Sequence, residues 1–438
     1  MSAPTIGEPG NTVEGISTPR KFTLPAEHEL RFEIPFDNAS DINLTLEHGS
    51  AEVFGIELAL NRPYTLPPGL NAAAFTWLGA TLSLAAPSNV MAYTAGDTPM
   101  PHYISAHSIL QSRRNLAMSA GIPGPRVMVV GPRDCGKTTL VKLLATYCVK
   151  VNTSVIVVDL DPSGCGAAGV VPGAVSLSVV KHLDLESGGL VHDKRTSVMV
   201  GHVSPRQNSL VSGKIFDTMG QILDRFLSKR DMSPSAGCII DTSGDIDGPD
   251  GPSCVISAVK AVKADVVFVL GAERLYASVN TEFEDSTIET VLLSKSGGVV
   301  SHDDSSRMAM RSRQIKHYFY GADNRLSPFS TVLNFSEITV LKVGGVVAVV
   351  PDSVLPIGAQ SSLDPLKPSR ITTLSETLHK VLGVSQASKE EQVLTSPVYG
   401  YVHVVKIDSD RNTLTVLAPS PGRIPSNFLL SGDTKWIE

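Results

Sequence analysis

The stretch PRVMVVGPRDCGKTTLVKLLATYCVK, residues 125–150, decides how the rest of the chain is interpreted. Its first part, residues 127–130, is a short apolar run typical of a buried β-strand. Every fixed position of the pattern GxxxxGK(S/T) then follows, as Gly131, Gly136, Lys137 and Thr138. Behind the motif, apolar residues recur at helical spacing: Leu140, Val141, Leu143, Leu144, Cys148 and Val149. Strand, loop and helix in this order predict a phosphate-binding P-loop, against the alternative of a chance match in a glycine-rich turn.

The residue types of this motif suit a nucleoside triphosphate. Its negative charges need backbone N–H groups that point inward, and the loop and the helix N-terminus supply them together with the positive end of the helix dipole. We expect Lys137 to reach the β- and γ-phosphates and the hydroxyl of Thr138 to ligate Mg²⁺.

Length and composition limit the possible classes of protein. A chain of 438 residues is long enough for two or three domains, and 42% hydrophobic with 18% charged residues is ordinary globular composition. A net charge of −6 argues against bulk electrostatic binding of nucleic acid. The five cysteines form no CxxC pair, and no signal core or membrane-length apolar run is present, so we expect reduced thiols in the cytosol or nucleus.

The pattern of strands and helices divides the chain into parts. We predict a flexible tail at residues 1–20, an N-terminal β domain at 21–118, a central P-loop domain at 119–330, and a C-terminal β-rich α+β domain at 331–438. In the central α/β domain a mainly parallel sheet is expected, because strands and helices alternate. Its further strands are predicted at 155–161, 238–242, 265–271 and 290–298, and helices at 102–120, 208–229, 253–263 and 301–320. C-terminal strands are predicted at 330–345, 346–356, 398–409 and 412–420, and Trp77 of the N-terminal domain is expected in a core.

Three aspartates at strand ends are candidates for metal or catalytic roles. Asp161 ends the apolar run VIVVDLD, where a carboxylate could hold Mg²⁺ or activate a hydroxyl. Asp159 would share its face of the strand, and Asp241 in CIIDT competes with Asp161 for the metal. Each aspartate could instead cap the turn that follows it.

A basic segment, RMAMRSRQIKHYF, offers a possible lid. Arg307 and Arg311 share one face at helical spacing, which would suit a lid that closes over phosphates. A solvated helix face explains the same spacing.

Motifs along nearly the whole chain resemble a known family. They are HELRFEI, AEVFGIEL, FTWLGATLSL and GDTPM; then GPRVMVVGPRDCGKTTLVKLL, DVVFVL with ERLY, LLSKSGGVV and YFYG; and finally PDSVLP and NFLL. The chain is similar to the eukaryotic pre-mRNA cleavage-complex subunit that in animals is also a polynucleotide 5′-hydroxyl kinase. The resemblance implies ATP with Mg²⁺, bound between the N-terminal and central domains.

The resemblance also implies residue roles. ATP contacts fall on Glu29, Asn71, Gly131, Asp134, Cys135, Gly136, Lys137, Thr138 and Thr139. Thr138 and Asp161 match the metal positions, and Asp161 is also the base for the 5′-hydroxyl in active kinases. Arg307 and Arg311 fall in the lid segment.

Two departures from the active kinases bear on catalysis. Where they continue Asp161 with Val-Gly-Gln-Gly, this chain has Pro162, Ser163, Gly164 and Cys165, and where a tryptophan stacks the terminal base, it has Asp245. Base stacking on an aromatic ring contributes roughly 1 to 3 kcal/mol, and a carboxylate at that place would repel phosphate.

The combination resembles the fungal branch, which implies an ATP-binding structural subunit of the nuclear cleavage and polyadenylation factor. Its partners would be other subunits of that factor, including a scaffold subunit on the central domain, with RNA contacted weakly or indirectly and no membrane. One alternative is an active RNA 5′-hydroxyl kinase. The other is a generic P-loop ATPase or GTPase switch, and the lack of an NKxD-like motif after DVVFVLG disfavours this second alternative.

Overall fold

The computed structural model describes residues 19–37, 41–187, 189–228, 234–248, 250–321, 324–343 and 366–438. These residues form two compact units: the described residues up to Val53 with Glu57–Gly96, and Phe54–Ile56 with the described residues from Asp97 to Glu438. The predicted tail at 1–20, except for its last two residues, and the predicted strand at 346–356 lie outside the described residues. Within the ranges given, no helix combines the length and apolar character needed to cross a membrane.

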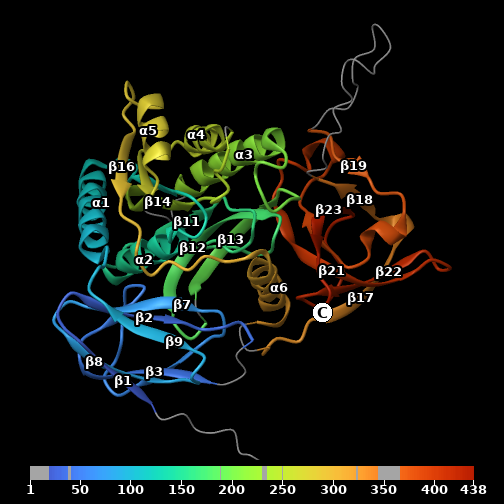
Figure 1. Cartoon of the computed structure of the whole chain (residues 1–438). Helices are drawn as coiled ribbons and strands as arrows, with labels where there is room; N and C mark the ends of the chain where they lie inside the picture. Colours follow the sequence, from blue (N-terminus) through green and yellow to red (C-terminus); the bar gives the residue numbers. More distant parts are fainter. Residues whose placement is uncertain are drawn as a thin grey trace, which may run out of the picture. The chain divides into compact units, whose positions relative to one another are not determined.

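The first unit is a sandwich of two antiparallel sheets, drawn in blue in Figure 1. One sheet has the order β1-β8-β3-β6 and the other β5-β4-β7-β2-β9. Alternating side chains such as Ile42, Leu44 and Leu46 are buried between the sheets, as expected for strands with one buried face. Trp77 follows β7 and stays 36% exposed, edge-on to Phe75, so its predicted core position is wrong. The strands are β1 Arg20–Leu24, β2 His28–Glu33, β3 Ile42–Gly49, β4 Glu52–Val53, β5 Ile56–Glu57, β6 Pro63–Leu66, β7 Asn71–Thr76, β8 Ala80–Ala85 and β9 Met91–Ala95.

The second unit is built on five parallel strands in the order β16-β15-β10-β14-β11. The sequence predicted all five strands, and the structure confirms them: β10 Arg126–Val130, β11 Val155–Asp159, β14 Cys238–Asp241, β15 Val266–Leu270 and β16 Glu289–Leu293. The predicted helices are confirmed as α1 Met100–Ala120, α3 Ser209–Leu227, α4 Gly251–Val262 and α6 Asp304–Tyr320. The described part also contains α2 Lys137–Lys150, which follows the P-loop as predicted, and α5 Glu273–Glu282, which the sequence analysis missed.

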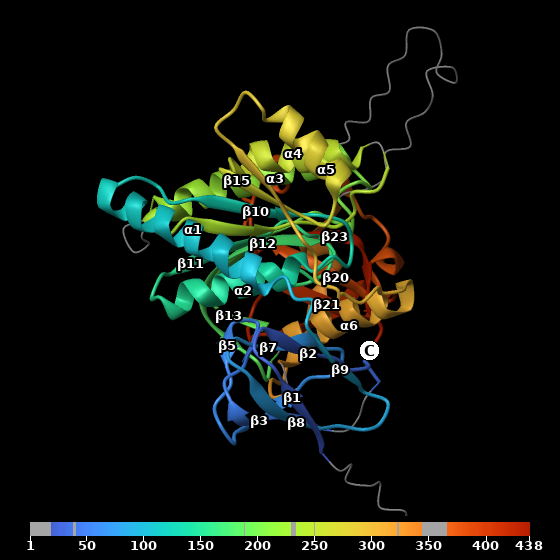
Figure 2. The same cartoon turned by 60° about the vertical axis from the view of Figure 1, so that its left-hand side comes forward.

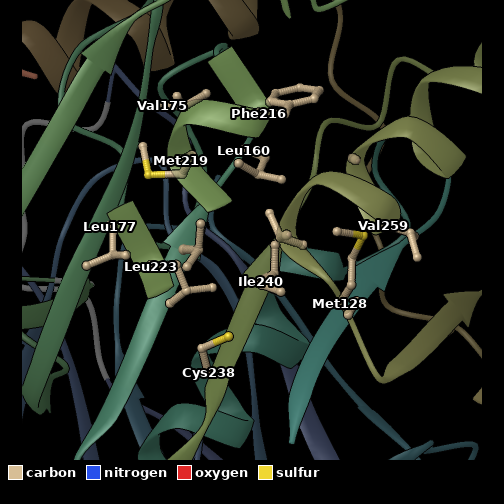
Figure 3. Close-up of a cluster of buried hydrophobic side chains, with 14 of the residues drawn as sticks. Met128, Leu160, Val175, Leu177, Phe216, Met219, Leu223, Cys238, Ile240 and Val259 are labelled. Carbon is tan, nitrogen blue, oxygen red and sulfur yellow. The ribbon is translucent and has the colours of Figure 1, made fainter. Parts of the chain in front are cut away.

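Helices cover both faces of this sheet, with α3 and α4 on one side and α2 on the other (Figures 1 and 2). The alternate residues Met128 and Ile240 point to the side of α3 and α4, and Met128 lies near Val259 of α4 (Figure 3). The intervening residues point to the α2 side, because successive side chains of a strand alternate between faces. The inner strands are buried on both faces and read as continuous apolar runs, whereas the edge strand β16 is largely exposed.

A long antiparallel hairpin extends the sheet beyond β11. It consists of β12 Ala174–Asp184 and β13 Gly189–Met199, which sequence analysis missed. In the segment AVSLSVV of β12, valine and leucine side chains face α3 and serine side chains face the opposite side. The segment was missed because its alternation is weak and it is less apolar than a buried parallel strand. The sheet is therefore mixed, with a parallel part and an antiparallel part.

The C-terminal segment is β-rich, as predicted. Its strands are β17 Phe329–Asn334, β18 Thr339–Lys342, β19 Ser369–Arg370, β20 Lys380–Ser385, β21 Val398–Asp408, β22 Thr413–Ala418 and β23 Phe428–Lys435. Strand β21 pairs with β13 at Ser197 and Val398, so these strands continue the sheet of the P-loop part. The predicted class, a P-loop α/β domain flanked by β-rich parts, is confirmed.

Candidate nucleotide-binding site

The predicted P-loop connects the middle parallel strand β10 with helix α2. It lies at the carboxyl ends of the parallel strands, the place where open α/β sheets bind ligands. Gly136 has φ 93°, a left-handed conformation that glycine adopts without strain, and α2 begins at Lys137 without a side-chain cap. Its first N–H groups are therefore not taken by a capping side chain, as an anion site requires.

Two of the predicted contact residues, Cys135 and Thr139, differ in the exposure of their side chains. Cys135 is 2% exposed, and a Cβ on Gly131 would lie 2.8 Å from its Sγ, so the thiol packs beneath the loop and leaves only backbone groups for a nucleotide. Burial raises the pKa of this thiol. Thr139 lies in the first turn of α2, and its side chain is exposed.

The lysine of the motif folds back over its own loop. Lys137 Nζ donates a hydrogen bond to the carbonyl oxygen of Pro132 at 2.7 Å, and the side chain is 7% exposed. A phosphate in the loop would exchange this neutral acceptor for a charged one, which strengthens a hydrogen bond. The backbone of Gly244 passes so near that an added Cβ would lie 2.7 Å from Nζ.

The hydroxyl of the motif meets a carboxylate from another strand. Thr138 Oγ1 donates to Asp241 Oδ2 at 2.8 Å, and the N–H of Ala167 donates to the same oxygen at 3.0 Å. A hydroxyl and a carboxylate side by side are oxygen ligands of the kind that Mg²⁺ takes in P-loop proteins. The described contacts thus bring Asp241, the weaker candidate from the sequence, to Thr138.

A second aspartate lies directly beside Asp241 in the sheet. Asp159 of β11 pairs with Asp241 of β14, so their side chains share the α2 face. Burial raises the pKa of Asp159 well above its usual value, and the negative charges of Asp241 and Asp161 raise it further. Burial likewise raises the pKa of Asp241, although Lys137 and Thr138 oppose the shift.

This face of the sheet carries a polar row across four strands. Ser176 of β12 pairs with Asp159, and Ser197 of β13 pairs with Ser176. At the far end the hydroxyl of Tyr401 donates to Ser197 Oγ at 3.0 Å. The row therefore extends from Thr138 of the P-loop to the C-terminal strand β21.

Asp161, predicted as base and metal ligand, follows β11 in a turn. Its Oδ1 accepts the N–H of Ser163 at 3.1 Å, and its Oδ2 accepts the hydroxyl of Ser163 at 2.7 Å. Both carboxylate oxygens thus bind the residue that replaces glycine in the Val-Gly-Gln-Gly pattern. This is the turn-capping alternative from the sequence, and it leaves the catalytic role as a hypothesis.

The lid arginines behave differently from one another. Arg307 of α6 donates to Asp134 Oδ2 at 2.5 Å, and the N–H of His302 donates to the same carboxylate at 3.1 Å, so a P-loop residue anchors the start of the lid segment. Burial alone would raise the pKa of Asp134, but the hydrogen bonds from His302 and Arg307 outweigh it and hold that pKa below its usual value. In Arg311, the buried Nε has no hydrogen-bond partner among the residues that the structure describes.

The residue at the tryptophan position is held by two arginines. Asp245 accepts a short hydrogen bond from Ser204, and its oxygens lie 3.2 Å from Arg133 Nη2 and 3.3 Å from Arg206 Nη1. The expected repulsion of phosphate by a lone carboxylate is therefore offset, because the two guanidinium groups leave this cluster with a surplus positive charge.

The two predicted ATP contacts in the first unit lie on neighbouring strands. Glu29 of β2 is 2% exposed and its Oε1 lies 2.6 Å from Arg31 Nε, while Asn71 begins β7 opposite Glu33. Glu29 is therefore a buried side chain with its carboxylate in an ion pair.

Sequence reasoning missed His302, Arg133 and Arg206. Arg133 lies inside the motif at a variable position, and the contacts of His302 and Arg206 join residues distant along the chain, so no local pattern marks them. Among the described residues, no group of three or more His, Cys, Asp and Glu side chains is arranged to hold a metal. Thr138 and Asp241 therefore fit Mg²⁺ only as part of a set that phosphate oxygens and water complete.

Comparisons with known protein families agree along the chain. Residues 23–117 match the N-terminal beta-sandwich domain of polyadenylation factor, residues 131–321 the mRNA cleavage and polyadenylation factor CLP1 P-loop, and residues 326–438 the pre-mRNA cleavage complex II protein Clp1. The Protein CLP1 homolog of Arabidopsis thaliana is 34% identical over 449 residues, covering 100% of this chain and 98% of the relative. The polyribonucleotide 5′-hydroxyl-kinase Clp1 of Homo sapiens is 34% identical over 435 residues, covering 99% and 100%.

A solved structure shares the fold. The Clp1p chain in a complex with Pcf11p (454–563) superposes with a TM-score of 0.82 at 20% identity, covering 96% of this chain and 99% of that one. With relatives matched over their full length, a complete phosphate-binding motif and the same succession of β-sandwich, P-loop and β-rich parts, the chain belongs to the CLP1 family of pre-mRNA cleavage and polyadenylation factors.

Proposed function

We propose that this protein is an ATP-binding subunit of the nuclear pre-mRNA cleavage and polyadenylation machinery that does not transfer phosphate efficiently. ATP is supported by the loop from Gly131 to Gly136 and by the position of Lys137 above it. A similar solved structure of Clp1p with Pcf11p, which addresses ATP loss in a point mutant, supports the same ligand. Thr138 and Asp241 would hold Mg²⁺, with Asp161 as the alternative carboxylate.

The observation that carries the lack of catalysis is the environment of Asp245. Phosphoryl transfer requires the acceptor hydroxyl to be held in line with the γ-phosphate, and orientation can account for several kcal/mol of a barrier, up to about 10. At the place implied for an aromatic platform, this chain has a carboxylate bound to Arg133, Arg206 and Ser204. Ser163 occupies both oxygens of Asp161, the residue implied as base.

A transfer assay tests this part of the proposal. Protein saturated with γ-labelled ATP and Mg²⁺ is incubated with a 5′-hydroxyl oligoribonucleotide, with the human kinase as the positive control. We expect no appreciable label on the RNA. Robust labelling that Asp161→Asn abolishes would contradict the proposal.

The second candidate function is an RNA 5′-hydroxyl kinase, which the names of several relatives favour together with the intact Lys137, Thr138 and Asp161. Asp245→Trp separates the two. Weak labelling of RNA that this substitution rescues would place the defect in acceptor binding and leave the phosphate-binding half intact.

The remaining elements of the proposal concern assembly. Other subunits of the cleavage and polyadenylation factor would bind this chain, one of them a scaffold on the central part. The solved complex of Clp1p with Pcf11p supports the binding of another subunit. The proposal includes domains at 21–118, 119–330 and 331–438, a nuclear location, and weak or indirect RNA contact. Co-purification of tagged protein from nuclear extract should recover these subunits, and recovery of the chain alone from both nuclear and cytosolic extracts would contradict the assembly role.

A further inference from the structure

Strand β17 forms a free edge of the C-terminal sheet. It pairs with β22 on one side, antiparallel and without a register shift (Figure 1). The N–H of Phe335 continues this pairing by donating to the carbonyl oxygen of Asn412, so alternate residues of β17 direct their main-chain groups toward β22. The residues between them direct theirs away from it: Ser330, Val332 and Asn334. In the part of the chain that the structure describes, no other strand pairs with these groups.

The edge also lacks the features by which proteins usually protect exposed strands. Charged side chains, proline, bulges and very short length are the common ones. Strand β17 has six residues, FSTVLN, with no charge, no proline and no bulge. Val332 is 64% exposed and Phe329 44%, so apolar side chains are accessible along it. We therefore expect another strand to cover this edge.

The apolar core next to β17 is open at the same edge. Leu414 and Val416 of β22 are fully buried in that core, whereas Leu333 and Phe335 pack against it and stay partly exposed. Phe329 shares their face, because side chains alternate along a strand. One face of the edge thus presents apolar side chains that the described residues cover only in part.

We propose that β17 pairs with β17 of a second copy of this chain, antiparallel and about a two-fold axis at Val332. Val332 then lies opposite the same residue of the second copy, and Ser330 lies opposite Asn334. In this register the outward main-chain groups of each copy bond to those of the other. The proposed function leaves the copy number of this subunit open, and the pairing sets it at two.

The same register joins the two open cores. It puts Phe329 opposite Phe335 and Thr331 opposite Leu333, on the face that packs against the core of each copy. Aromatic and β-branched pairs across neighbouring strands stabilise a sheet, and offset or edge-on aromatic rings add to the burial of their area. A foreign strand would need this succession of residues by chance, whereas a second copy supplies it by symmetry.

Charges at the two ends of the strand favour the antiparallel orientation. Arg325 precedes β17, and Glu337 follows it. The turn between β21 and β22, next to this second end, adds Asp408, Asp410 and Arg411, with a sum of one negative charge. A two-fold axis at the middle of β17 brings the basic end of each copy to the acidic end of the other, which is complementary. Such an interface uses the same patch on both copies, so it closes as a dimer and does not propagate into a fibre.

The test measures the oligomeric state of the full chain by sedimentation velocity over a wide range of concentration. Val332→Lys puts two ammonium groups opposite each other and should raise the dissociation constant of the dimer about tenfold or more. Val405→Lys is the matched control, because Val405 is 45% exposed and lies on β21, which has strands on both sides. The wild type and this control should show the same equilibrium between monomer and dimer.

A second variant tests the register itself. Opposed residues in a hydrogen-bonded antiparallel pair have Cα atoms about 5.5 Å apart, a separation that a disulfide spans. Oxidised glutathione, which takes up the two electrons, should therefore link Val332→Cys into a covalent dimer. The wild type and Val405→Cys, which keep the native cysteines, should remain unlinked.

A chain that is monomeric at every concentration would overturn the proposal, and so would a dimer that Val332→Lys leaves unchanged. A dimer that Val332→Lys weakens but that Val332→Cys does not link would overturn the register at Val332. Covalent linkage in Val332→Cys together with a weakened dimer in Val332→Lys supports both the edge and the register.

Discussion

The hydroxyl of Thr138 and the carboxylate of Asp241 form a hydrogen bond of 2.8 Å that joins the first turn of α2 to the end of β14. The two residues are 103 positions apart in the chain. Among the contacts that the structure describes, this bond brings a strand-end carboxylate to the phosphate-binding motif. It therefore makes the assignment of Asp241 as a metal ligand testable.

Mg²⁺ should raise the affinity for ATP, and Asp241→Asn should make this increase roughly tenfold smaller. The reason is that a charged metal ligand is replaced by a neutral one of equal size. Calorimetry with and without Mg²⁺ measures the difference. Asp161→Asn is the matched comparison, since Asp161 is the other candidate. A loss confined to Asp161→Asn would reassign the metal to that residue.

Lys137→Ala should lower ATP affinity about tenfold or more, since a charge-assisted contact contributes about 1.5 to 3 kcal/mol. Lys150→Ala, at the other end of the same helix, controls for loss of a positive charge from α2. Equal ATP affinity in the two variants would refute the assignment of the P-loop.

Asp159 should make stability fall as pH rises. The pKa of Asp159 in the folded chain lies well above its usual value of 3.8 in the unfolded chain. Above pH 3.8 the folded state therefore retains a proton that the unfolded state releases. The free energy of unfolding decreases as pH rises toward and through the folded pKa. The free energy of unfolding of Asp159→Asn, measured with urea, should therefore increase relative to that of the wild type as pH rises from about 5 to 8. These two values span roughly the usual range of maximal stability.

Asp224→Asn is the control for that experiment. Hydrogen bonds from Lys263 and Arg126 outweigh burial and hold the pKa of Asp224 below its usual value, so the group stays ionised in both states over this range. Its effect on stability should be constant with pH. The same flat response in Asp159→Asn would show that Asp159 does not retain its proton on folding.

Arg307→Ala should loosen the start of α6. The lowered pKa of Asp134 means that its contacts stabilise the fold above pH 3.8 and are lost as pH falls through the folded value. At neutral pH, hydrogen exchange in the first turn of α6 should accelerate by about tenfold in the variant, as loss of a charged hydrogen bond predicts. Lys316→Ala, exposed on the same helix, should leave it unchanged, and equal exchange in both variants would exclude the anchor.

Asn71→Ala should weaken ATP binding, because the family resemblance implies that Asn71 contacts the nucleotide. It is a cleaner test than Glu29→Gln, because Glu29 is buried beside Arg31 and breaking a buried ion pair costs about 3 to 5 kcal/mol of stability. Asn43→Ala, in the other sheet of the same unit, is the control. Normal ATP affinity in Asn71→Ala would remove this residue from the site.

The sequence by itself determined those parts of the protein whose signal is contiguous. Gly131 to Thr138 could be predicted as a P-loop because strand, loop and helix follow one another directly. The inner parallel strands could be predicted because burial on both faces makes them apolar throughout, while the edge strand β16 is largely exposed. The hairpin of β12 and β13 escaped notice because serines line one of its faces.

Only the tertiary structure decided which distant residues meet. Register between β11 and β14 places Asp159 beside Asp241, and the return of α6 brings Arg307 to Asp134 across 173 positions. It also surrounds Asp245 with Arg133 and Arg206, which reverses the charge expected there from the sequence. Such contacts depend on strand order and helix packing, which follow from burial of the whole core and have no local pattern in the chain.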